Sequence, residues 1–332
     1  MRGLSRIAFS ALFMMAVGPA SVHAASPTDK GDGGSAYPIK PIRWIIDFPA
    51  AGVSDVLART VGQRLSENLG QPIVFDNRPG ANGIIANSLV AKSPPDGYTL
   101  GFISQPFSLQ FTEHAKHGLR VEDFVAVGLI AEYPSLILVH PGVPVNNLKE
   151  FVAYAKKKSP PPTYASSGAG GAQHLAMEVF KKMAGFDAVH IPYSGSAPGL
   201  LDVMGGRVDS IFANLPGALP HIRAGRVKAL AIAGKARNRV ISDVPTFAEA
   251  GWPFDAPGYA GAVFPARVPG ALVRKMNAEI VRVLNMPEVQ ERILNAGCEA
   301  RTSTPEAFAK FLREDIARWT LVIKAAGATA QN

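Results

Sequence analysis

The chain has 332 residues, a formal net charge of +8 and a single cysteine, Cys298. A chain of this length buries about three quarters of its surface and normally divides into two domains. The basic residues are dispersed along the sequence, which argues against a nucleic-acid surface. Cys298 has no partner for an intramolecular disulfide, and we predict that it serves packing.

The first 24 residues have the pattern of a secretory signal peptide. Arg2 and Arg6 form a basic start, an uncharged apolar stretch covers 7–17, and small residues precede a cleavage site after Ala24. The apolar stretch is too short to span a bilayer. We therefore predict export to the periplasm. Because the segment carries two arginines and no acidic residue, its removal lowers the net charge by two, to +6.

After a polar segment at 25–36, predicted to be a disordered tether, strands and helices alternate. This alternation predicts an α/β fold with parallel sheets covered by helices on both faces. The strands are predicted at 41–48, 72–75, 98–104, 163–166, 187–191, 207–212, 227–233 and 259–265. The helices are predicted at 54–69, 84–91, 172–184, 197–204, 216–224, 269–284, 287–296 and 305–325.

Ligands of open α/β sheets bind beyond the carboxyl ends of the strands, where loops enter helix N-termini. The first such junction, 48–55, is rich in small residues, so its backbone amides can approach an anion. Its candidate binding residues are Phe48, Ala50, Ala51, Gly52 and Ser54. Ser54 either binds the solute or caps its helix. For Asp55 we predict capping alone, because a second carboxylate would repel an anionic ligand.

The second junction, 166–174, invites comparison with a dinucleotide-binding loop. The comparison fails, because Gln173 stands where the fingerprint that starts at Gly168 and Gly170 needs Gly or Ala. A bare anion cradle fits this junction better. His174 lies in the first helical turn, where it either contacts the solute or is a buried structural histidine. The candidate residues are Gly168, Ala169, Gly170, Ala172, Gln173 and His174.

A third junction, 192–198, supplies Tyr193, Ser196 and Ala197, either as solute contacts or as an ordinary capped turn. Asn214 follows the strand at 207–212, where its amide could read a second polar group of the solute. No metal-binding spacing, nucleophile elbow or cofactor fingerprint occurs in the sequence, so we predict no enzyme activity, no metal and no cofactor. A secreted hydrolase that pairs Ser167 with His174 is kept as an alternative.

A set of segments in consistent order from residue 37 to about 325 resembles the Bordetella uptake gene (Bug) family, the substrate-binding receptors of tripartite tricarboxylate transporters. The segments include Tyr37-Pro38-Ile39-Lys40-Pro41-Ile42-Arg43, Asn77-Arg78-Pro79-Gly80-Ala81, Pro95-Asp96-Gly97-Tyr98-Thr99-Leu100, Gln173-His174-Leu175-Ala176 and Pro192-Tyr193-x-Gly195-Ser196-Ala197-Pro198.

The resemblance implies a periplasmic binding protein type II-like fold, with two Rossmann-like domains joined by two crossing strands. It also implies a small carboxylate in the interdomain cleft, held by the first junction and by the loop before Gln173. We place domain 1 at 37–137 plus 257–332 and domain 2 at 138–256. The implied partners are a large and a small integral-membrane transporter subunit, and we expect a monomer. A sensor that passes its ligand state to a signalling partner is an alternative.

The sequence departs from the family pattern at three positions near the first junction. Asp47 stands where the family usually has Pro, and Ala51 replaces the first residue of a common Gly-Gly pair. Both changes leave the identity of the carboxylate open. Asn82 replaces a common Gly, a change that the backbone tolerates because Asn adopts positive φ more readily than most residues.

Overall fold

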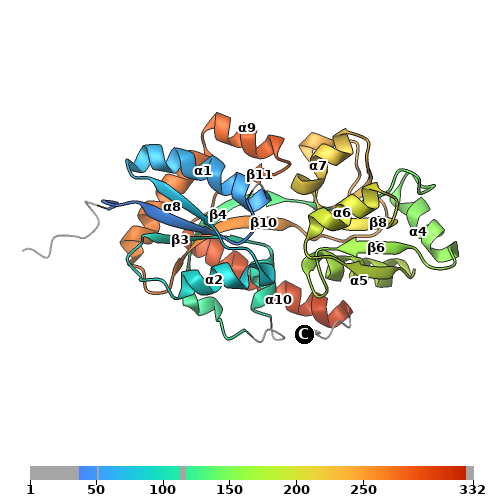
Figure 1. Ribbon diagram of the computed structural model, residues 1–332, viewed down its shortest axis with the longest axis horizontal. Coiled ribbons are helices and arrows are strands. Elements are labelled where there is room, and N and C mark those ends of the chain that lie inside the picture. The colour runs from blue at the N-terminus through green and yellow to red at the C-terminus, as the bar shows by residue number, and fades with distance from the viewer. Residues whose placement is uncertain (1–36, 51, 113–116, 327–332) are drawn as a thin grey trace, which may run out of the picture. The chain divides into compact units, whose positions relative to one another are not determined.

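The computed structural model describes residues 37–50, 52–112 and 117–326, all within the compact unit 36–332 (Figure 1). The predicted signal peptide and tether lie outside the described residues. Within them, the chain forms two mixed β-sheets, each covered by helices on both faces. This arrangement confirms the predicted α/β fold with two domains.

The first domain is built on the strands β1 (Ile42–Ile46), β2 (Ile73–Asn77), β3 (Thr99–Ser104), β4 (Phe124–Tyr133), β10 (Gly258–Pro265) and β11 (Glu299–Ala300). Their order across the sheet is β11-β4-β10-β3-β1-β2. One face packs against α1 (Val53–Leu69), α8 (Gly270–Leu284) and α9 (Pro287–Asn295). The other face packs against α2 (Ile84–Ala91), α3 (Pro106–Gln110) and α10 (Pro305–Ala326).

The second domain is built on β5 (Ser135–Val139), β6 (Thr163–Ser166), β7 (Val189–Pro192), β8 (Ser210–Asn214) and β9 (Lys228–Ala233). Their order is β7-β6-β8-β5-β9. The helices α4 (Leu148–Lys157) and α5 (Ala172–Ala184) cover one face. The helices α6 (Ser196–Met204) and α7 (Leu215–Arg223) cover the other.

The prediction of purely parallel sheets is wrong. β1 pairs in parallel with β2 and β3, but β10 runs antiparallel to β3 and β4, and β5 runs antiparallel to β8 and β9. The alternation rule applies only where a helix joins consecutive strands. β4 and β5 are separated by Pro134 alone, and the sequence analysis did not identify either strand.

The chain crosses between the two sheets twice. It leaves the first sheet at Pro134 and returns through 234–257 to β10. The last residue of β4, Tyr133, is the register partner of the first residue of β10, Gly258. A Cβ on Gly258 would lie 2.0 Å from the Tyr133 ring, so only glycine fits at this close approach. The two crossings therefore meet the first sheet at the same end of two neighbouring inner strands, β4 and β10.

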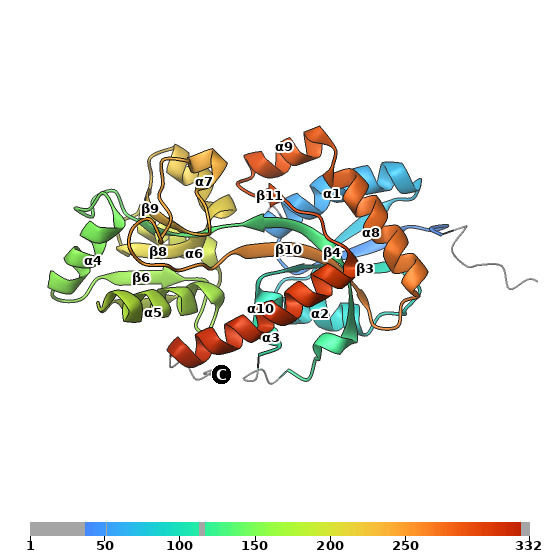
Figure 2. The same ribbon diagram turned by 180° about the vertical axis from the view of Figure 1, so that it is seen from behind.

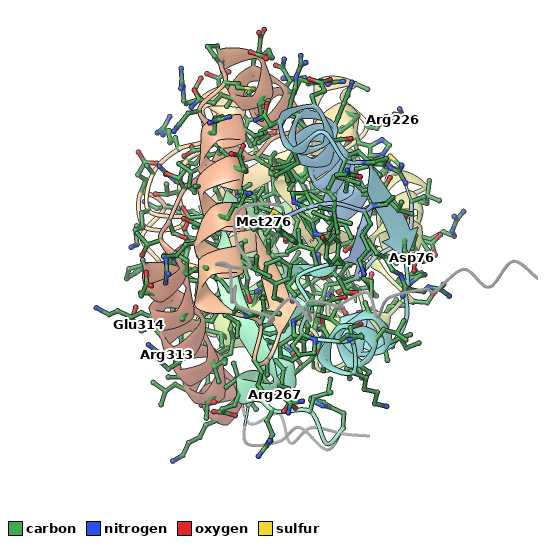
Figure 3. The ribbon with its side chains drawn as sticks, turned by 90° about the vertical axis from the view of Figure 1, so that its left-hand side faces the viewer. Asp76, Arg226, Arg267, Met276, Arg313 and Glu314 are labelled. Carbon is green, nitrogen blue, oxygen red and sulfur yellow. The ribbon has the colours of Figure 1, made fainter. Side chains whose placement is uncertain are left out.

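Helix α10 connects the two domains by packing (Figure 2). It contacts β4 and α3 in the first domain and α5 in the second. Its residues Trp319 and Ile323 form a small buried cluster with Leu175 of α5. Figure 3 shows Arg313 and Glu314 on the opposite, exposed side of the helix, while Met276 of α8 is buried in the core of the first domain.

None of the helices within the described residues combines the length and the apolar character that a crossing of the bilayer requires.

Candidate functional site

Each of the three predicted junctions ends in a helix whose N-cap is a glycine. The N-cap residues are Gly52 of α1, Gly171 of α5 and Gly195 of α6, and no side chain caps any of the three. By contrast, the side chain of Asn147 caps α4 and accepts from the amide of Glu150 at 2.9 Å. Since uncapped first-turn amides point away from the helix, all three termini can receive an anion.

In the first junction, the predicted N-cap role of Asp55 is wrong, and so is the N-cap alternative for Ser54. Gly52 adopts the extended conformation of an N-cap, so α1 begins at Val53 and both polar residues lie inside its first turn. The carboxylate of Asp55 accepts hydrogen bonds from Nε of Arg59, at 2.9 Å to each oxygen. Asp55 therefore stabilises its own helix through an ion pair with Arg59 and not as the predicted N-cap.

The segment that leads into Gly52 is held by a hydrogen bond at Phe48 and is exposed at Ala50. The carbonyl oxygen of Phe48 accepts a hydrogen bond from Nδ2 of Asn77 at 2.9 Å, and the Phe48 side chain is half-buried. Ala50 is exposed, whereas Ala51 lies outside the described residues. A Cβ on Gly52 would lie 3.1 Å from the carbonyl oxygen of Pro49, which leaves little room for a side chain.

The second and third junctions are joined through the side chain of Gln173. Its Oε1 accepts a hydrogen bond from the Ser167 amide at 3.1 Å and another from the Ser196 hydroxyl at 2.9 Å. Gly168 and Gly170 have φ values of 138° and 72°, which residues with a Cβ rarely adopt. Gln173 thus holds a glycine loop and the start of α6 together, which the sequence did not reveal.

A serine–histidine contact fixes the base of this glycine loop. Oγ of Ser166 lies 2.7 Å from Nε2 of His190, and it also accepts from the amide of Gly168 at 3.1 Å. The serine side chain is fully buried. Nδ1 of His174 accepts from the amide of Gly170 at 3.1 Å instead of contacting Ser167. The arrangement positions the loop and does not resemble the Ser167–His174 pair of the hydrolase alternative.

The two histidines stack on each other, with ring centroids 4.1 Å apart, and His190 stacks further on Tyr164. Burial, and to a smaller extent the nearby His174, lowers the pKa of His190 to about 4. Burial also lowers the pKa of His174. Both rings are therefore neutral at pH 7. An anion at the second junction would meet backbone dipoles and not cationic histidine side chains.

The remaining predicted residues lie at or beside these junctions. The hydroxyl of Tyr193 donates to Asp202 at 2.6 Å, and Oδ1 of Asn214 accepts from the Ser135 hydroxyl at 3.0 Å. That contact joins the end of β8 to the start of β5. The side chains of both residues thus already have protein partners. Ala172 is half-buried at the start of α5, and three candidates are exposed: Ala169, Gly170 and Ala197.

A buried polar residue beneath the first junction was noticed in the sequence only as a departure from the family pattern. Asp47 follows β1 directly and is 2 % exposed. Its Oδ2 accepts from the Ser104 hydroxyl at 2.6 Å, while its Oδ1 has no hydrogen-bond partner in the described part of the chain. Burial raises the pKa of Asp47 to about 6, and the hydroxyls of Ser104 and Ser54 oppose this rise.

The turn that covers Asp47 has an unusual backbone. Four successive residues, Gly80, Ala81, Asn82 and Gly83, have positive φ, so the predicted tolerance of Asn82 is confirmed by its φ of 51°. A Cβ on Gly83 would lie 3.3 Å from the Cβ of Asp47. Non-glycine residues in this region carry strain of about 1–3 kcal/mol each, which is characteristic of functional sites.

Comparison with known proteins agrees with this geometry. The family model described as "Tripartite tricarboxylate transporter family receptor" matches residues 57–328. Protein BugT of Bordetella pertussis is 33 % identical over 296 residues, which cover 88 % of this chain and 91 % of BugT.

Two solved structures share the fold along most of their length. Rpa4515 of R. palustris, solved with adipate, has a TM-score of 0.80 and 33 % identity, over 88 % of this chain and 98 % of the other. MatC (Rpa3494) of Rhodopseudomonas palustris, with bound malate, has a TM-score of 0.77 and 29 % identity, over 86 % and 100 %. Together with the family match over 57–328, these similarities show that the chain belongs to the tripartite tricarboxylate transporter receptor family, as the ordered sequence motifs had indicated.

Proposed function

We propose that the chain is a periplasmic receptor that captures a small organic carboxylate for a tripartite transporter. The observation that carries this proposal is the set of glycine-capped helix starts at the three junctions. The carboxylate rests on backbone amides of 50–54 in one domain and 168–172 in the other. Neither segment contains Lys or Arg, so the affinity comes from oriented N–H dipoles, at about 0.3–2 kcal/mol for each helix start.

Two related structures narrow the chemical class of the proposed solute. The two similar structures were solved with adipate and with bound malate, and both solutes are dicarboxylates. The family consists of receptors and not of enzymes, and Nδ1 of His174 accepts from the Gly170 amide and does not contact Ser167. The membrane partners proposed for this chain are the large and small transporter subunits. A sensor role would use the same solute site and differs only in the partner that reads its occupancy.

A thermal-shift screen followed by isothermal titration tests solute capture. At a concentration of one hundred times its dissociation constant, a true ligand adds about 2.7 kcal/mol to the stability. We expect mono- or dicarboxylates to raise the melting temperature and to bind with micromolar affinity, about 8 kcal/mol. The neutral methyl esters of the same acids are the matched control and should fail. Equal binding of acid and ester would show that the site does not recognise an anion.

The localisation is tested on protein recovered from the periplasmic fraction. Because small residues precede Ala24, we expect mass spectrometry to find the mature N-terminus after Ala24 or within two residues of it. A chain that still begins at Met1, or its recovery from the cytoplasmic fraction alone, would contradict the proposed export.

A further inference from the structure

Asp47 presents a chemical conflict at the first junction. It lies at the carboxyl end of β1, one residue before Phe48, and its carboxyl group is buried with Oδ1 unpartnered among the described residues. The hydroxyl of Ser54, in the first turn of α1, lowers the pKa of the same carboxyl group. The group therefore lies beneath the helix start that the proposed function assigns to an anion, and an unpartnered buried oxygen at such a place calls for a missing partner.

The groups around Asp47 do not supply a compensating charge. On β3 its neighbour is the hydroxyl of Ser104, and the turn before α2 contributes the backbone of Gly83. On β4, Tyr133 is a buried phenol whose pKa burial raises, with a further rise from Asp47 itself, so it stays neutral. On α1, the charged side chains of Asp55 and Arg59 pair with each other. The effects that lower the pKa of Asp47 come from hydroxyls and backbone amides, not from cations.

Two carboxylates that share a low-dielectric site cannot both remain ionised, because their repulsion raises the pKa of one of them. A solute carboxylate at the start of α1 would therefore drive a proton onto Asp47. The proton converts the unpartnered Oδ1 from an acceptor into an O–H donor. A carboxylic acid that donates to a carboxylate forms a short, charge-assisted hydrogen bond.

We propose that Asp47 is a solute-binding residue that acts in its protonated form, donating from Oδ1 to the solute carboxylate, so that one proton enters with each anion. The proton comes from hydronium or from the acid form of the buffer, whose bond to that proton breaks as the Oδ1–H bond forms, and no other covalent bond changes. The proposal rests on the proposed function and goes beyond it, because it makes capture of the solute dependent on pH. A proline at this position, as in the usual family pattern, has no group that could act in this way.

The substitution Asp47→Asn separates the donor from the titration. The asparagine carbonyl can accept the hydrogen bond from Ser104, and its NH2 group takes the place of the protonated Oδ1 as a permanent donor. The substitution Asp47→Ala removes the donor altogether. Asp55→Asn is the matched control, since Asp55 is also a buried carboxylate in this region but already has Arg59 as its partner.

The experiment is isothermal titration of the full mature chain with adipate, malate, succinate and benzoate between pH 6.5 and 8.5. The carboxyl groups of these probes stay ionised throughout that range. Burial lowers the pKa of both stacked histidines, and the pH profile of Asp47→Asn measures any contribution from their titration. With a pKa of about 6 for Asp47, the wild type should lose affinity by about tenfold per pH unit, or nearly a hundredfold overall. Asp47→Asn should bind with no pH dependence, Asp47→Ala weakly and without pH dependence, and Asp55→Asn with the wild-type slope.

Titration in buffers of different ionisation enthalpy measures the proton directly. At pH 7.5 we expect an uptake of about one proton per solute for the wild type and none for Asp47→Asn. If the wild type binds a probe with a flat pH profile and no proton uptake, the role of Asp47 is wrong and the receptor function stands. If no probe binds at any pH, the receptor function fails and the inference fails with it. The wild-type measurement decides the matter even if a variant does not fold.

Stability without solute gives an independent measurement. The folded pKa of Asp47, about 6, lies above its ordinary value of 3.8. Its contribution to stability is therefore fully present below about pH 4 and is lost as the pH rises through 6. Asp47→Asn should melt several degrees above the wild type at pH 8, and this advantage should vanish by pH 4. A melting temperature for Asp47→Asn at pH 8 equal to or below that of the wild type would show that Asp47 is not a buried, destabilised carboxylate, and would overturn the inference.

Discussion

Replacing Gly52 by Asp is expected to weaken solute binding by at least about a hundredfold, or about 2.7 kcal/mol. Gly52 is the N-cap of α1, and a Cβ at this position meets the carbonyl oxygen of Pro49 at 3.1 Å. The new carboxylate would take the first-turn amides for itself, because Asp is a favoured N-cap. It would also repel the carboxylate of the solute, so the anion site would be both occupied and wrongly charged.

The same substitution distinguishes a blocked site from a misfolded chain. An Asp N-cap stabilises a helix by only a few tenths of a kcal/mol relative to a Gly N-cap, which helps to offset the tight contact with Pro49, so the melting temperature of Gly52→Asp should stay near that of the wild type. Gly52→Asn is the matched control, since it caps equally well without the charge and should bind better than Gly52→Asp. Both are measured by isothermal titration and thermal unfolding. A folded Gly52→Asp that binds within threefold of the wild type would place the anion elsewhere.

Replacing Trp319 by Ala is expected to lower the stability by about 3–5 kcal/mol, the usual cost of deleting a buried aromatic side chain. Trp319 is 1 % exposed in α10 and packs with Ile323 against Leu175 of α5. In a chain of this size the loss corresponds to a fall in melting temperature of about 5–15 °C. Because α10 also packs on the first domain, the contact joins the two halves of the molecule.

Two further variants on α10 test whether the loss of stability comes from the packing of Trp319. Leu321 lies on the same helix but is 68 % exposed, so Leu321→Ala should change the stability by no more than about 0.5 kcal/mol. Nε1 of Trp319 has no hydrogen-bond partner in the described part of the chain, so Trp319→Phe loses only part of the packing and should lie between Trp319→Ala and the wild type. Thermal unfolding that shows equal effects for Trp319→Ala and Leu321→Ala would contradict the packing of α10 on α5.

The sequence predicts most of the fold, because helix periodicity and glycine stops are local signals. The helices at 84–91 and 172–184 and the strand at 163–166 match α2, α5 and β6 along their whole length. The sequence analysis missed β4 and β5, which no helix separates, and it mispredicted the direction of β10, which runs antiparallel to β3. The start of α1 was misplaced by one residue, because backbone conformation selects Gly52 as the N-cap over the better side-chain cap at Ser54.

The sequence predicts the loops of the candidate site but not the contacts between them. Junctions rich in small residues at strand ends are visible in the sequence, whereas hydrogen bonds between neighbouring strands are not. Asp47 meets Ser104 across 57 positions because β1 and β3 pair in parallel. Ser166 meets His190 because β6 pairs with β7. The register places Pro192 opposite Ser166, and His190 lies two residues before Pro192 on the same strand. Periodicity within one segment cannot reveal which strands become neighbours.

The pairing of Tyr133 with Gly258 has a consequence for how the molecule is assembled from its sequence. The whole stretch from Pro134 to 257, including the strands and helices of the second domain, leaves and re-enters the first between two residues that are direct antiparallel partners. Such partners lie about 4.5–5.5 Å apart between Cα atoms, a gap that a two-residue hairpin turn closes. The second domain is thus a single insertion in the β4–β10 hairpin. One half of the proposed solute site can therefore be exchanged for that of a relative at this single junction, without cutting any other strand of the first domain.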